Sequence, residues 1–193
     1  MRKRIDESKI YEVALKQFAK YGYKKTTLEE IADKLGMTGA NLYSYTNSKQ
    51  DLYHGSVSYG LRKWQKYVLD SLEGMDDPAE RFETLCSKSV EYLGKDKTFR
   101  TVLKHDPDIF PMFPEADPYE EINLASYQLL KDSIERGVNA GVFADVDIEK
   151  CTRLLFTIYK TLIIETYIKD EETLGAGGIE ETIKVLMRGI LKR

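Results

Sequence analysis

One short segment of this chain carries polar side chains whose types and spacing suit hydrogen bonding to a nucleic acid. If residues 39–45 form a helix, Leu42 turns inward and small, amide, hydroxyl and phenol groups are left facing outward. The outward residues are Gly39, Asn41, Tyr43 and Ser44. An amide such as that of Asn41 can form two hydrogen bonds with adenine, while hydroxyl and phenol groups can hold phosphates. These groups therefore favour recognition of DNA.

Lys49 places a positive charge close to this segment. The stretch Ser48-Lys49-Gln50-Asp51 reads as a capping box, so Lys49 falls in the first turn of a further helix. An ammonium group in that position opposes the helix dipole unless an anion lies nearby. We therefore expect an anion such as phosphate beside Lys49.

The flanking residues predict a helix-turn-helix that would position these groups. Thr27 and Glu30 match a capping box at the start of a short helix. Gly36 suits the left-handed stop of that helix, and Thr38 can cap the next one. Two short helices joined in this way most often place the second helix in the major groove of DNA.

A preceding helix from Asp6 to Tyr21 is expected to complete a three-helix head, with Tyr21 on its buried face and Gly22 at its end. Residues 1–54 contain ten Lys and Arg against seven Asp and Glu, whereas the remainder contains nineteen against twenty-five. A basic head on an acidic body suits phosphate binding at one end of the molecule. The basic arm Arg2-Lys3-Arg4 can lie along phosphates.

The order of residues in this head resembles the N-terminal signature of the tetracycline-repressor (TetR) family of bacterial transcription regulators. The residues that carry the resemblance are Phe18, Gly22, Tyr23, Thr26, Thr27, Ile31, Ala32, Gly36, Thr38, Ala40, Leu42, Tyr43, Tyr45, Ser48, Lys49 and Leu52. The chain departs from the family at Thr46, where Phe is usual, and at Gly39, where a basic or polar residue is frequent.

The resemblance implies an all-α homodimer of roughly nine helices per subunit, with a three-helix DNA-binding head and a larger body that binds a ligand and forms the dimer. It also implies phosphate contacts from Thr27, Tyr43 and Lys49. Base edges would be approached by Thr38, Gly39, Asn41, Ser44 and Tyr45. An alternative for Tyr43 and Tyr45 is that both are core aromatic residues.

Helical periodicity continues through nearly all of the remaining chain. We expect a DNA-binding domain over residues 1–54 and a regulatory and dimerisation domain over 55–193. A long helix from Lys49 to about Leu72 would join them. Further helices are expected from Pro78 to about Leu93, Lys97 to His105, Pro118 to Asn139, Ile148 to Ile168 and Ile179 to Ile190.

The last two expected helices are candidates for a dimer interface, since the first of them is apolar on more than one face. Residues 175–178 would turn the chain between them. Candidate interface residues are Leu154, Phe156, Ile163, Tyr167, Ile179, Ile183, Leu186 and Ile190. The alternative is that both helices only complete the core of the monomer.

Aromatic residues of the body are candidates to line a pocket for an apolar or aromatic molecule. The candidates are Phe99, His105, Phe110, Met112, Phe113, Tyr127 and Tyr159. The proline-rich stretch 106–117 could cover such a pocket as a lid. Aromatic residues at helical spacing are more often plain core, and that alternative stays open.

The sequence offers little support for other classes of protein. Only two histidines occur, and G-x-S-x-G, glycine-rich phosphate loops and metal-ligand spacings are missing, so we expect no enzyme, cofactor or metal site. No apolar run could span a membrane or act as a secretory signal, which favours the cytoplasm. Cys86 and Cys151 are expected to be reduced.

The function that the sequence predicts is transcription regulation by a ligand-responsive dimer. Its expected partners are double-stranded operator DNA, a second copy of the chain and a small apolar or aromatic effector that releases a repressor from DNA. The alternatives are a helical interaction protein and a regulator without a small-molecule ligand.

Overall fold

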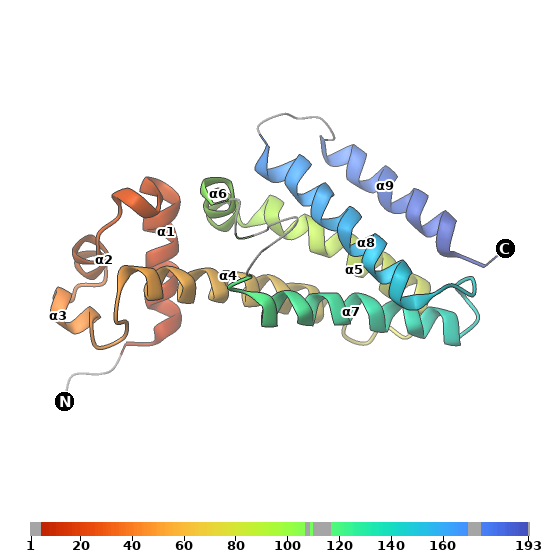
Figure 1. The fold of residues 1–193 in the computed structure, drawn as a ribbon, viewed down its shortest axis with the longest axis horizontal. Coiled ribbons are helices and arrows are strands. Elements are labelled where there is room, and N and C mark those ends of the chain that lie inside the picture. Colours follow the sequence, from red (N-terminus) through yellow and green to blue (C-terminus); the bar gives the residue numbers. More distant parts are fainter. Residues whose placement is uncertain (1–4, 107–108, 110–116, 170–174, 193) are drawn as a thin grey trace.

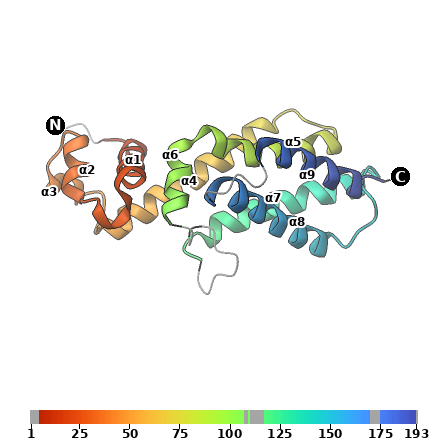
Figure 2. The same cartoon turned by 90° about the horizontal axis from the view of Figure 1, so that it is seen from above.

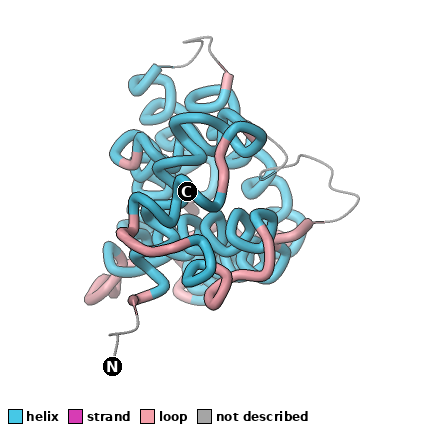
Figure 3. The backbone as a smooth tube through the Cα atoms, turned by 90° about the vertical axis from the view of Figure 1, so that its left-hand side faces the viewer, coloured by secondary structure: helices cyan, strands magenta, loops and turns pink. Residues whose placement is uncertain are grey.

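The computed structural model describes residues 5–106, 109, 117–169 and 175–192. Within these ranges the chain forms nine α-helices and one π-helical turn, together with an isolated bridge between Phe143 and Leu191. Short loops join the helices (Figure 3). The expected all-α fold with a small head and a larger body is confirmed, and the two parts follow one another along the long axis of the molecule (Figures 1 and 2).

Three helices form the head, and a longer set forms the body. The head contains α1 (Glu7–Lys25), α2 (Leu28–Lys34) and α3 (Gly39–Leu42). The helix that leaves the head is α4 (Lys49–Ser71). The body continues with α5 (Pro78–Lys95), α6 (Lys97–His105), α7 (Glu120–Asn139), α8 (Ile148–Ile163), the π-helical turn η2 (Ile164–Ile168) and α9 (Gly175–Ile190).

Helix α1 changes course near its end, where Gly22 adopts a φ of 76°. Side chains at Ile10, Ala14 and Phe18 form its buried face, as the periodicity predicts. The expectation that Tyr21 is buried is wrong, because 43% of its surface is exposed. The regular helix stops one residue later, so no further turn covers the Tyr21 ring, and Lys20 lies over it instead.

The long helix α4 joins the head to the body without a break. Its N-terminal half packs against α1, and its C-terminal half packs against α5 and α7. Gly60 lies directly against the ring of Phe99 on α6, so a larger residue at this position would overlap the ring. In Figures 1 and 2, α6 lies between α1 and the helices of the body.

Local contacts fix several helix ends in the body. Asp77 caps α5 and accepts a hydrogen bond from the backbone N–H of Glu80 at 2.8 Å, with Pro78 as the first helical residue. Phe143, only 1% exposed, packs beneath the end of α7 against Gly137. No helix in the described ranges combines the length and the apolar character needed to cross a bilayer.

Two expectations for the C-terminal helices need correction. Residues 175–178 form the first turn of α9 and not a connecting turn. Glycine weakens a helix by only about 1 kcal/mol per residue, and packing of α9 against α5 can offset that cost. The helix expected to run to Ile168 stays α-helical only to Ile163 and ends in η2.

Gly60→Ala should lower the free energy of unfolding by about 1–3 kcal/mol, because the added methyl group would overlap the Phe99 ring. Chemical denaturation measures this change. Gly189→Ala on α9 is the control, because its methyl group would meet nothing within 4 Å. The control should be neutral or more stable by up to about 1 kcal/mol. Equal stability of the two variants would contradict a tight contact between α4 and α6.

Candidate functional site

The helix-turn-helix in the structure follows the predicted capping pattern. Thr27 Oγ1 accepts a hydrogen bond from Glu30 N at 3.2 Å, and Glu30 Oε2 accepts one from Thr27 N at 2.9 Å. Gly36 has a φ of 66°, in the left-handed region, and turns the chain between α2 and α3. Thr38 then caps α3 by accepting from Asn41 N at 3.3 Å. These local contacts fix the direction in which α3 leaves α2.

Helix α3 is shorter than expected, since it ends at Leu42 and not at residue 45. Beyond it, Ser44 N donates to Asn41 O at 3.2 Å and Tyr45 N donates to Leu42 O at 2.9 Å. Hydrogen bonds between residues three apart tighten the last turn as in a 3₁₀-helix. Leu42 is fully buried, so α3 is anchored by its inner side.

The outer side of α3 presents the groups that the sequence singled out. Tyr43 is 52% exposed. Within the described residues the Asn41 side-chain amide forms no hydrogen bond, so its donor and acceptor both remain available. The Ser44 hydroxyl donates to Asn41 O at 2.7 Å. Thr38 is exposed and Gly39 partly exposed beside them. The face combines an amide, a phenol and two hydroxyls.

Tyr43 and Tyr45 have different environments. Tyr45 is half-buried against the core of the head, and its hydroxyl accepts a hydrogen bond from Ile5 N at 3.1 Å. The alternative of a core aromatic residue therefore fits Tyr45 and does not fit Tyr43. Thr46, where the family usually has Phe, is buried and donates its hydroxyl proton to Ser48 O at 2.9 Å.

Lys49 lies in the first turn of α4, and its ammonium group is already engaged. Nζ donates to Tyr23 O at 3.0 Å and to Thr26 O at 3.1 Å, and it lies 4.5 Å from the centre of the Tyr23 ring. Carbonyl oxygens at the end of α1 thus take the place of the anion that the sequence led us to expect. Lys49 joins the end of α1 to the start of α4.

Two hydrogen bonds between side chains connect the start of α4 to the body. Tyr53 Oη donates to Asp106 Oδ2 at 2.7 Å, just beyond α6. His54 Nδ1 lies 3.1 Å from Tyr119 Oη, just before α7. Burial raises the pKa of Tyr53, and the hydrogen bond to Asp106 raises it further. The Tyr53 hydroxyl therefore keeps its proton and remains a donor.

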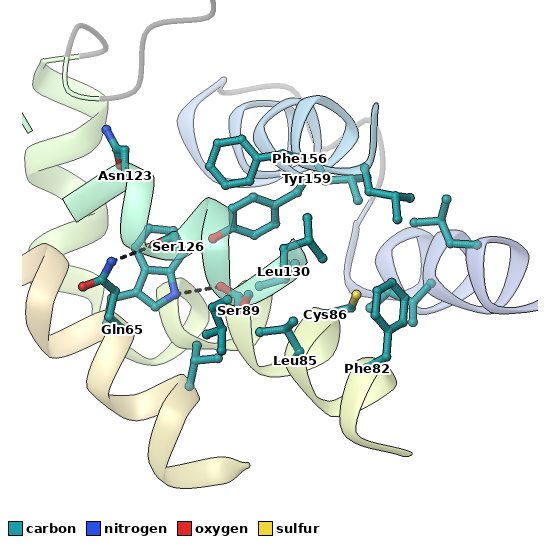
Figure 4. Close-up of a pocket in the computed structure, with 18 of the residues that line it drawn as sticks. Gln65, Phe82, Leu85, Cys86, Ser89, Asn123, Ser126, Leu130, Phe156 and Tyr159 are labelled. Carbon is teal, nitrogen blue, oxygen red and sulfur yellow. Dashed lines mark hydrogen bonds between the residues drawn. The ribbon is translucent and has the colours of Figure 1, made fainter. Parts of the chain in front are cut away.

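A cavity lies inside the body between α4, α5, α7, α8 and α9 (Figure 4). The space open to water centres is about 90 Å³, several times what one water needs. Aliphatic and aromatic side chains form most of the wall, including Trp64 on α4 and Phe156 on α8. Trp64 is held by a hydrogen bond from Nε1 to Ser89 O at 2.9 Å and by stacking on Tyr92.

Of the seven residues expected to line a pocket, Tyr159 lies on the wall of this cavity. Phe99 is fully buried behind Trp64, with ring centres 6.5 Å apart, and does not reach it. His105 is exposed at the end of α6. The Tyr127 hydroxyl donates to Glu149 Oε1 at 2.8 Å, away from the wall. Three more, Phe110, Met112 and Phe113, lie outside the described residues.

Sequence reasoning missed the polar part of the wall. Gln65, Asn123 and Ser126 lie together at one end of the cavity (Figure 4). Gln65 Nε2 donates to Ile122 O at 2.5 Å and to Ser126 Oγ at 2.8 Å, which ties α4 to α7. One feature of the sequence could have indicated it: Gln65 directly follows Trp64, which belongs to the apolar stripe of α4.

The eight candidate interface residues fall into several groups. Ile163, Ile183 and Ile190 are buried within their own subunit. Phe156, Leu186 and again Ile183 line the cavity. Tyr167 has Arg100 over its ring at 5.8 Å. The Ile179 side chain lies outside the described part of the structure.

Leu154 on α8 is 62% exposed, the most of the seven candidate interface residues whose side chains are described. Val185 on α9, which the sequence analysis did not select, is 57% exposed. The two helices therefore each combine a face turned into the subunit with an exposed apolar side chain.

A helix-turn-helix whose second helix presents polar groups, carried on an all-α body with an internal cavity, defines the class of helix-turn-helix transcription regulators. Residues 10–55 match the sequence profile of the bacterial regulatory proteins of the tetR family. The head of the chain is therefore a DNA-binding domain of the tetR family, as its resemblance to that family predicted.

Known transcription regulators are similar to this chain over most of its length. The transcriptional repressor KstR2 of Mycobacterium tuberculosis is 24% identical over 76% of this chain and 74% of its own length. The HTH-type transcriptional regulator YhgD of Bacillus subtilis is 23% identical over 83% of this chain and 84% of its own. A regulator from Saccharomonospora viridis, solved in complex with choline, is 20% identical and matches the fold with a TM-score of 0.80 over 95% of this chain and 96% of its own.

Lys49→Met should lower the free energy of unfolding by about 1–2 kcal/mol, because carbonyl groups at the end of α1 lose their donor. Thermal or chemical denaturation in the absence of DNA measures the loss. Lys24→Met removes an exposed lysine from the same turn and should change stability by less than about 0.5 kcal/mol. If the two variants are equally stable, Lys49 has no structural role in the head.

Proposed function

We propose that this regulator is a dimeric repressor that binds operator DNA through two helix-turn-helix heads and leaves it when a small molecule occupies the cavity. The observation that carries the proposal is that one helix serves both sites. Helix α4 begins beside the helix-turn-helix and contributes Trp64 and Gln65 to the cavity wall. Among the relatives, KstR2 is named as a repressor and the Saccharomonospora viridis protein was solved with choline.

The proposed DNA contacts divide into two groups. Thr27, Tyr43 and Lys49 would hold phosphates, and Thr38, Gly39, Asn41, Ser44 and Tyr45 would lie close to base edges. Exposure supports Tyr43 most directly, and the free amide supports Asn41 as the group that reads a base. Thr27 and Lys49 would have to share groups that already form contacts within the head.

A second copy of the chain is proposed to cover the exposed apolar side chains of α8 and α9. Leu154 on α8 and Val185 on α9 support this interface, because large apolar side chains are costly to leave in water. A two-fold axis also suits operator recognition, since it presents two α3 helices to two half-sites.

Release is proposed to follow from movement of α4. A ligand in the cavity would displace α4 relative to α7. Two hydrogen bonds now join these helices: Gln65 binds Ile122 at the cavity, and His54 binds Tyr119 near the head. A shift of α4 would then change the separation of the two heads, so that they no longer match successive major grooves. The effector is proposed to be a small apolar or aromatic molecule.

We assign DNA binding to residues 1–54 and regulation and dimerisation to 55–193. Residue 54 lies inside α4, so the helix continues across this boundary, and what changes there is the set of helices that α4 packs against. Tyr53 packs edge-on against Phe18 of α1 with ring centres 4.9 Å apart, whereas Trp64 stacks on Tyr92 of α5 at 5.8 Å.

Tyr43→Phe should weaken DNA binding about three- to tenfold, because it removes one hydrogen bond to phosphate and keeps the ring. Binding is measured on a duplex that the wild-type protein selects from a random library. Tyr127→Phe removes a hydroxyl in the body and is the control, with unchanged affinity expected. Unchanged affinity in Tyr43→Phe and in Tyr43→Ala would remove Tyr43 from the DNA-binding surface.

Leu154→Glu should shift the chain from dimer to monomer, because a carboxylate would be buried in the proposed interface. Sedimentation velocity over a range of concentrations reports the change. Leu124→Glu on α7 is a matched control, since Leu124 is 61% exposed and lies outside the proposed interface. A dimer that survives Leu154→Glu and dissociates in Leu124→Glu would place the interface elsewhere.

A further inference from the structure

The described residues that line the cavity carry no formal charge. Most of their side chains are aliphatic or aromatic. The others are Gln65, Cys86, Ser89, Asn123, Ser126 and Tyr159. Burial raises the pKa of the Cys86 thiol to about 12, and it also raises the pKa of the Tyr159 phenol, so both groups are neutral near pH 7. The described wall therefore offers no ion to balance a charged ligand.

Hydrogen-bonding groups gather at one end of this cavity. Gln65, Asn123 and Ser126 lie at the end beside the start of α7, while Phe82 and Cys86 lie at the opposite end (Figure 4). The side-chain amides of the wall are therefore confined to one end, and Cys86, Ser89 and Tyr159 interrupt an otherwise apolar remainder (Figure 4). A ligand that fits this distribution has one polar group on an apolar body.

The amides at the polar end have their N–H groups in use. Gln65 Nε2 donates to Ile122 O and to Ser126 Oγ, and Asn123 Nδ2 donates to Asp117 Oδ2 at 2.7 Å. Because a backbone carbonyl and a carboxylate only accept, these bonds fix which way each amide faces. In the described structure no donor reaches either amide oxygen. Among the described residues, both amide oxygens are therefore acceptors that have no partner.

We infer that the cavity takes an uncharged molecule with an apolar body and a single hydroxyl or N–H donor, and that this donor lies at the end where Gln65, Asn123 and Ser126 gather. This inference rests on the proposed function of the cavity as an effector site. An ionised carboxylate would lose its hydration without a cation among the described wall residues to pair with it. A quaternary ammonium group would lose its hydration without a carboxylate among the same residues and has no donor to offer.

Three ligands with the same tail and different head groups test the inference on the wild-type chain. They are 1-decanol, used below its solubility limit, and decanoate and decyltrimethylammonium, each used below its critical micelle concentration, all at pH 7.5. Isothermal titration and thermal shift should show binding of 1-decanol. The two ions should bind at least about 100-fold more weakly than 1-decanol, because burial of an unpaired ion is costly.

A pH series separates the acid from its anion. Lowering the pH from 7.5 to 5.5 should raise the apparent affinity for decanoic acid about tenfold per pH unit, because only the protonated form enters the cavity. Affinity for 1-decanol should not change over this range. Affinity for decanoate that is independent of pH would show that the anion itself is bound and would overturn the inference.

Two substitutions at one position give a matched test of charge. Gln65→Lys should create a preference for decanoate, and Gln65→Glu should create a preference for decyltrimethylammonium, each by at least about tenfold over wild type. Thermal unfolding confirms that each variant is folded. If either variant does not fold, the three-ligand series on the wild-type chain decides the question alone.

The possible outcomes separate this inference from the proposed function. Equal or tighter binding of either ion by the wild-type chain overturns the inference, and so does failure of all three ligands to bind. Neither result affects DNA binding or dimerisation, which are measured without ligand. If 1-decanol binds but leaves the DNA complex intact, the inference stands and the proposed release mechanism fails.

Discussion

The continuity of α4 is the constraint on which the rest of this structure depends. The helix runs from Lys49 to Ser71 without a break, and buried residues of its two halves belong to different surroundings. Tyr53 lies among the aromatic rings of the head, and Trp64 lies in the wall of the cavity. Because one unbroken helix joins the two sites, it is the element through which we propose that a change at the cavity reaches the head.

Contacts on both sides of α4 explain how a small change could reach the DNA-binding surface. Gln65 ties it to α7 at the cavity, and His54 ties it to Tyr119 near the head. At its first turn, Lys49 binds the carbonyl groups that end α1. The family-like lysine thus has a structural role in this chain, in addition to the phosphate contact that we propose for it.

Local interactions account for what the sequence predicted well. The capping box of Thr27 and Glu30, the left-handed Gly36 and the exposed Tyr43 depend on neighbours within a few residues. The cavity depends instead on the packing of five helices. Gln65 comes to face Ser126 across 61 positions of sequence, and Phe99 is kept off the wall by Trp64. Helical periodicity identifies a buried face but not which neighbour covers it. This is why only Tyr159, of the four expected pocket residues that the structure describes, lines the cavity.

The most direct test of the coupling through α4 is the distance between the two heads of a dimer, measured by double electron–electron resonance. Spin labels at Lys34→Cys on α2, with Cys86 and Cys151 replaced by Ser, report this distance on the selected DNA duplex and with the cavity saturated by 1-decanol. We expect a narrow distribution on DNA that suits half-sites about one helical turn apart, and a displaced or broader one with ligand. Identical distributions in the two states would contradict the account.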